Sequence, residues 1–80
     1  MSYTPGPWFV PERTGTQYVE ARIGGGWLQE VAACGPTEKP EEQRANARLI
    51  AAAPTMAAYI KKRADAGDAE AATIWESFNA

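Results

Sequence analysis

Histidine is absent from this chain of 80 residues, and cysteine occurs once, as Cys34. Without histidine the chain lacks the commonest metal ligand and the commonest general base. A lone cysteine excludes a disulfide within one chain and is typical of a reducing compartment. A nucleophilic Cys34 would need an activating base. We therefore interpret Cys34 as a small apolar residue at a strand end, and we expect no enzyme activity, no cofactor and no metal.

Long apolar runs and a strong charge of one sign are also missing. No apolar run approaches the ~20 residues of a membrane-spanning helix, so no membrane span is expected. The formal net charge is −2, and basic residues gather only at residues 61–63. Proteins that neutralise several phosphates usually carry a larger basic patch. Nucleic-acid binding is therefore not expected, and scattered acidic residues argue against mimicry of nucleic acid.

Large apolar side chains are scarce, because alanine supplies much of the 45% hydrophobic fraction. A chain of this length buries about 60–65% of its unfolded surface, which leaves a thin core. We therefore predict a single small domain over residues 1–80. We also expect a homo-oligomer, since self-association commonly supplements a core of this size.

The chain opens with a segment that cannot be regular structure. TPGPW, residues 4–8, contains two prolines that each fix φ and remove a backbone donor, and a glycine that permits a tight turn. This turn is expected to hold Trp8 in place. WFV, residues 8–10, then predicts a short strand, and TGT, residues 14–16, predicts a loop or turn.

Two longer segments follow with the pattern of a β-hairpin. QYVEARI (Gln17–Ile23) alternates apolar and polar residues, and WLQEVAAC (Trp27–Cys34) is a second β-like run. GGG (Gly24–Gly26) separates them and is interpreted as the turn. A phosphate-binding loop is the alternative, but the lysine and the following helix of such loops are missing.

The second half is helical. GPTEKP, residues 35–40, reads as a linker, and Thr37 or Pro40 could begin a helix that runs to about residue 53. Acidic residues 41 and 42 suit its first turn without any catalytic role. Pro54 should end this helix, since it has no N–H and would clash with the carbonyl of Ile50.

Two further helices are predicted after Pro54. One spans roughly residues 54–66 and ends at Gly67, and Asp68 can cap another over Ala69–Phe78. The chain is therefore predicted to be an α+β protein. A three-stranded antiparallel β-meander over residues 1–34 and a linker at 35–39 precede two or three α-helices, packed on one face, over residues 40–78.

Asn46 and Arg48 stand out in the apolar stretch NARLIAAAP, residues 46–54. Helical spacing predicts an apolar face toward the sheet that includes Asn46. In a structural interpretation Asn46 hydrogen-bonds a strand end or the TPGPW turn, and Arg48 stacks on an aromatic side chain such as Trp8 or pairs with a carboxylate. In a functional one, both line a pocket with Trp8 for an anionic or nucleotide-like ligand. The predicted face comprises Glu42, Ala45, Asn46, Leu49, Ile50 and Ala53.

TPGPW near the start and ANARLIAAAP, residues 45–54, resemble a widespread family of small tailed-phage and prophage proteins. The chain departs from the family after Pro54, where TMAAYIKKRADAG replaces an acidic, leucine-rich run, and DAEAATIWESFNA is interpreted as particular to this protein. The resemblance implies a phage-encoded accessory protein in the host bacterial cytoplasm.

Three functions are compatible with that setting. The first is an anti-defence inhibitor that binds stoichiometrically, either a host defence protein through Tyr18 and Trp27 or Trp75 and Phe78, or a nucleotide signal in a pocket of Trp8, Asn46 and Arg48. The second is a structural or regulatory accessory protein that only oligomerises. The third, an enzyme such as a nucleotide hydrolase, is the least supported.

Overall fold

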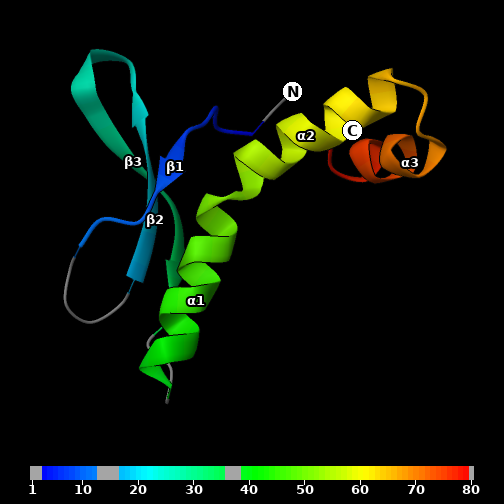
Figure 1. Cartoon of the computed structure of the whole chain (residues 1–80). Coiled ribbons are helices and arrows are strands. Elements are labelled where there is room, and N and C mark those ends of the chain that lie inside the picture. Colours follow the sequence, from blue (N-terminus) through cyan, green and yellow to red (C-terminus); the bar gives the residue numbers. More distant parts are fainter. Residues whose placement is uncertain (1–2, 13–16, 36–38, 80) are drawn as a thin grey trace.

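The computed structural model describes residues 3–12, 17–35 and 39–79. Within them the chain forms a three-stranded antiparallel sheet followed by three helices, so the predicted α+β fold is confirmed (Figure 1). The expected loop at residues 14–16 and the alternative helix start at Thr37 lie outside the described residues. Strands β1 to β3 and helices α1 to α3 span Trp8–Phe9, Gln17–Ile23, Trp27–Cys34, Pro40–Ala51, Ala53–Asp65 and Ala69–Phe78.

The sheet has the strand order β1-β2-β3, with β2 in the centre. Trp8 pairs with Ala21, and Val19 pairs with Ala32. The pairing shifts between Val19 and the next residue of β2, which leaves an extra residue in β3. A bulge of this kind bends and twists a hairpin.

The β2–β3 hairpin was predicted at its observed bounds. Its turn, Gly24–Gly26, is a single 3₁₀ turn in which Gly25 and Gly26 have φ of 80° and 82°. Residues with side chains rarely adopt this left-handed conformation, so the backbone of the turn requires glycine at these two positions. The turn lies at the end of a hairpin that projects beyond α1 (Figure 1).

Helix α1 packs on one face of the sheet. Val19 and Ala47 are fully buried at this contact, and they form the core together with Cys34, which lies at the end of β3 as expected. A small Ala47 side chain lets the helix axis come close to the sheet. Gln43, one turn earlier, is also buried and packs directly over Gly35.

The predicted sheet-facing side of α1 is confirmed for Ile50, which packs against the core, and is wrong for Asn46 and Leu49. Asn46 is exposed and Leu49 is 63% exposed, whereas Gln43 and Ala47 face the sheet. The helix is turned by roughly the 100° that separates neighbouring residues. The prediction rested on helical spacing, which also allows the neighbouring face, and it is this face, with Ala47 and Ile50, that packs against the core.

The break between α1 and α2 falls at Ala52, two residues before Pro54. Pro54 therefore occupies the first turn of α2, where its missing N–H leaves no helical hydrogen bond unmade. The predicted break is confirmed, and its position differs from the prediction by two residues.

Helices α2 and α3 form a helical hairpin. Gly67 joins them with φ of 100°, and the Asp68 carboxylate accepts a hydrogen bond of 3.0 Å from the Ala71 N–H, which confirms both predicted ends. The two helices pack mainly against each other, and α2 carries α3 away from the sheet (Figure 1). We expected all the helices to pack on one face of the sheet, but it is mainly α1 that covers this face.

The TPGPW turn joins the sheet to this helical hairpin. The Trp8 indole N–H donates to the Thr4 carbonyl oxygen at 3.0 Å, as expected of a turn that fixes Trp8. Gly6 lies so close to Pro54 that an added Cβ would be 2.7 Å from the proline Cβ. The two motifs noticed in the sequence therefore meet in space, with the glycine of one packed on the proline of the other.

Candidate binding surfaces

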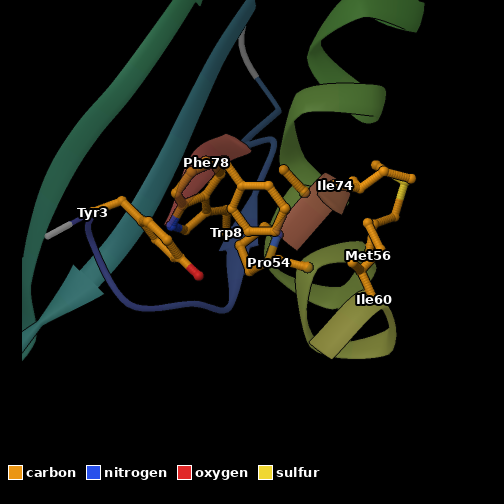
Figure 2. A pocket seen from close by; sticks show the side chains of 9 residues that line it. Tyr3, Trp8, Pro54, Met56, Ile60, Ile74 and Phe78 are labelled. Atoms are coloured by element: carbon orange, nitrogen blue, oxygen red, sulfur yellow. The ribbon is translucent and has the colours of Figure 1, made fainter. Parts of the chain in front are cut away.

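The most apolar hollow lies where β1 meets α2 and α3. Figure 2 shows Tyr3 and Trp8 of the N-terminal part together with Phe78, and Met56, Ile60 and Ile74 of the two helices beside them. Its volume is about 530 Å³. We call it the apolar groove. It is lined by Tyr3, Trp8, Ala53, Pro54, Met56, Ala57, Ile60, Ile74 and Phe78.

Local structure explains how these side chains meet. Met56 and Ile60 are one turn apart on α2, and Ile74 and Phe78 are one turn apart on α3, so each pair lies on a single helix face. The ring of Phe78 lies 6.5 Å from the ring of Tyr3, which links the far end of α3 to the N-terminal segment. The groove is therefore formed by tertiary contacts between segments far apart in the sequence.

The groove is suited to apolar contact and not to proton chemistry. Its lining contains no acidic or basic residue. Met56 and Ile74 remain 42% and 43% exposed, so the groove is open along one side. Next to Phe78, the Trp75 ring packs edge-on, with 5.2 Å between the two ring centres. The Lys61 ammonium lies 5.7 Å from the centre of the Trp75 ring.

A second hollow, of about 640 Å³, lies between α1 and the segment after β1. Arg44 and Arg48 reach it from one flank of α1, four residues apart, and Glu12 and Gln17 lie on the other side. Two guanidinium groups could bind a carboxylate or a phosphate. The Glu12 carboxylate in the same hollow would oppose an anion.

A third hollow, beside the α2–α3 connection, contains groups already used by the fold. The Arg63 guanidinium lies 3.5 Å from the Asp68 carboxylate. The hydrogen bond from the Ala71 N–H is the main reason that the pKa of Asp68 is lowered, and Arg63 lowers this pKa further. We therefore assign Asp68 to capping α3 and not to a ligand.

The end of the β2–β3 hairpin is a further exposed apolar surface. Trp27 is 72% exposed, and Ile23 and Leu28 beside it are also exposed. Residues Ile23 and Trp27 pair across the strands, next to the glycine turn. We call residues 23–28 the hairpin tip. A tryptophan exposed at the end of a projecting hairpin is available for contact with another protein.

The structure does not bring Trp8, Asn46 and Arg48 into one pocket, as the functional interpretation required. Trp8 lines the apolar groove, Arg48 lines the second hollow, and Asn46 lies in neither. Trp8 packs near Pro54, which is eight residues, or about 12 Å of helix, beyond Asn46. The expected stacking of Arg48 on Trp8 is wrong for the same reason.

The remaining predicted residues have separate positions. Trp27 is at the hairpin tip, Tyr18 is half-buried in β2, and Trp75 is half-buried behind the apolar groove. Sequence reasoning did not single out Met56 and Ile60 as site residues. Their spacing of four, repeated by Ile74 and Phe78, was a usable signal.

Within the described parts of the chain there is neither a metal-binding cluster nor a membrane-spanning helix. No group of three or more His, Cys, Asp or Glu side chains in these parts of the chain could hold a metal ion. The described helices also include none that is both long and apolar enough to cross a membrane.

Comparison with known protein families shows the family to which the chain belongs. A sequence model for Salmonella phage P22 protein Y8K6 matches residues 1–78. The chain belongs to the Y8K6 family. The Y8K6 match includes the sheet, both segments noticed in the sequence and all of α3, so residues 68–78, interpreted above as particular to this protein, are part of the family. Searches of curated proteins and of solved structures found no match.

Proposed function

We propose that this phage accessory protein is a non-enzymatic anti-defence inhibitor that binds a host defence protein stoichiometrically in the bacterial cytoplasm. The observation that carries the proposal is Trp27, which is 72% exposed at the end of a hairpin that projects from the body of the molecule. Tryptophan is among the residues that most often dominate the energy of protein–protein contacts.

The chemistry around Trp27 supports a protein partner. Ile23 and Leu28 extend the apolar surface, and Arg22, with its guanidinium 5.6 Å from the centre of the Phe9 ring, lies next along β2. An apolar centre with a polar edge is the usual arrangement of a protein-binding surface. The glycine turn adds no side chains that would hinder a partner from approaching the tryptophan.

Sequestration of a nucleotide signal is the second candidate, and it would use the hollow of Arg44 and Arg48. Its support is weaker, because the residues that line this hollow include no aromatic side chain on which a base could stack, and Glu12 would repel phosphate. An accessory protein that oligomerises without any ligand is the remaining alternative.

A plaque assay tests the proposal. The protein is expressed in strains that carry individual defence systems, and each strain is challenged with a phage that the system restricts. We expect plaques to be restored on one strain, and Trp27→Ala to abolish the rescue. Leu49→Ala is the matched control, because Leu49 is an exposed apolar residue on α1, away from the hairpin tip.

Other results would separate the alternatives. If Arg44→Ala and Arg48→Ala abolish rescue while Trp27→Ala does not, the sequestration mechanism replaces protein binding. Absence of rescue across the panel, with expression confirmed, would contradict the anti-defence proposal and favour the accessory protein without ligand. Sizing chromatography of wild type and Trp27→Ala with the identified defence protein then reports the complex directly.

A further inference from the structure

The molecule exposes more surface than a compact chain of its size. A compact protein of 8.6 kDa exposes about 4,700 Å², whereas this chain exposes 5795 Å². Its radius of gyration is 14.6 Å, against about 11.6 Å for a compact domain of this length. The excess of about 1,100 Å² exceeds the roughly 800 Å² that each partner contributes to a standard stable interface.

The α2–α3 hairpin contributes to this surface, because its two helices pack mainly against each other. The smallest extent of the molecule is 17 Å, and α2 and α3 extend away from the sheet (Figure 1). One face of the α2–α3 hairpin contains the apolar groove. Tyr59, which is 63% exposed, lines the third hollow, and this hollow shares Ile60 and Ile74 with the groove. A two-helix hairpin covers its apolar side fully only when further elements pack on it, as in a four-helix bundle.

We infer that the face formed by the apolar groove and Tyr59 is the contact surface of a homodimer, in which the α2–α3 hairpins of two copies pack together. This inference is independent of the proposed function, which uses the hairpin tip. In a twofold dimer each copy presents the same face, so an open groove beside projecting side chains is suited to self-complementary packing.

The charges of the helical hairpin are compatible with a second copy. Residues 53–79 contain three basic and four acidic side chains, which leaves a net charge of −1. Lys61 contacts Asp65 at 2.9 Å and Arg63 contacts Asp68 at 3.5 Å, so these charges are neutralised within each chain. Two hairpins can therefore approach without strong repulsion.

A second copy fits this face better than a small apolar ligand does. Binding pockets for small molecules usually enclose 70–90% of the ligand surface. This groove is open along one side, and a ligand within it would leave Tyr59 uncovered. A second helical hairpin would cover the groove and Tyr59 together.

Sedimentation velocity over a concentration series from micromolar to submillimolar tests the inference on the full chain. We expect a reversible dimer of twice 8.6 kDa. Met56→Glu, which would place an unpaired charge in the contact, should weaken dimerisation by about 100-fold or more. Leu49→Glu is the control, because it adds the same charge at an exposed apolar residue outside this face.

A wild-type monomer at submillimolar concentration would overturn the inference, as would an unchanged dimer of Met56→Glu or a weakened dimer of Leu49→Glu. A monomer that retains an apolar small molecule would also overturn it. Hydrogen exchange on the wild type needs no variant to fold: segments around Met56 and Ile74 should become more protected as the dimer forms. Protection confined to the hairpin tip would contradict the proposed contact.

Discussion

At the scale of single residues, one close contact of the fold joins two motifs that lie almost fifty residues apart. Gly6 packs on Pro54, and this contact holds the N-terminal turn against the start of α2. Position 6 requires glycine because Pro54 leaves no space for a side chain, and not because the backbone has a positive φ. It also explains why Trp8, two residues later, reaches the apolar groove.

Gly6→Ala should destabilise the protein by about 1–3 kcal/mol, because the added methyl group would overlap Pro54 and force the turn to shift. Urea unfolding followed by tryptophan fluorescence measures the change. Gly24→Ala is the matched control, since nothing lies within 4 Å of a Cβ at that position. Equal effects of the two substitutions would contradict the role of this contact.

Asp68 is the residue whose ionisation is most clearly coupled to the fold. The Ala71 N–H, and then Arg63, stabilise its carboxylate and lower its pKa. A lowered folded-state pKa stabilises the protein above the ordinary pKa of about 4, and this contribution is lost as the pH falls through the folded value. Asp68→Ala should therefore lower the melting temperature at neutral pH and reduce its fall in acid.

Thermal unfolding between neutral pH and pH ~3 tests this prediction. Asp65→Ala is the comparison, because Asp65 forms only an exposed ion pair with Lys61, and such pairs contribute little to stability. If Asp65→Ala changed the acid sensitivity as much as Asp68→Ala does, the cap would not be the cause.

At the scale of elements, the rotation of α1 about its axis decides which of its residues pack against the sheet. Ala47 is fully buried against β2, while Asn46 beside it is exposed. Ala47→Leu should destabilise the protein by about 1–3 kcal/mol through overpacking. Asn46→Leu should change the free energy of unfolding by less than about 0.5 kcal/mol.

Chemical denaturation of these two variants tests the packing of α1. They carry the same new side chain at neighbouring positions of one helix. Alanine is a better helix former than asparagine, so helix propensity accounts for roughly 0.5 kcal/mol of the difference, and overpacking should add to it. A larger loss from Asn46→Leu would support the face predicted from the sequence over the observed one.

At the scale of the whole molecule, two exposed apolar surfaces lie on different parts of a flat, extended structure. The hairpin tip ends the sheet, and the apolar groove lies at the helical hairpin (Figure 1). Because the surfaces do not share residues, their roles should be separable. Trp27→Ala should lose binding to the defence protein and still dimerise, whereas Met56→Glu should be monomeric and keep the tip available.

A combined assay of phage rescue and sedimentation for Trp27→Ala and Met56→Glu checks this separation. Loss of both properties in each variant would show that the two surfaces act together. In that case, dimerisation would be required to present the hairpin tip to its partner.

Local chemistry in the sequence determined the elements and most of their ends. Alternation in Gln17–Ile23 and the glycines at 24–26 specify the hairpin, because the side-chain period and the left-handed turn are local properties. Pro40, Gly67 and Asp68 act on helix ends within one turn of themselves, so their effects could be predicted without knowing the fold.

Tertiary structure alone decided the rotation of α1, the direction of the α2–α3 hairpin and the composition of the apolar groove. Spacing along NARLIAAAP allows either Asn46 or Ala47 to face the sheet, and the packing of α1 against Val19 and Cys34 buries Ala47. The groove joins Trp8 to Phe78 across most of the chain. Contacts over that separation depend on how elements pack, which the periodicity within each element does not encode.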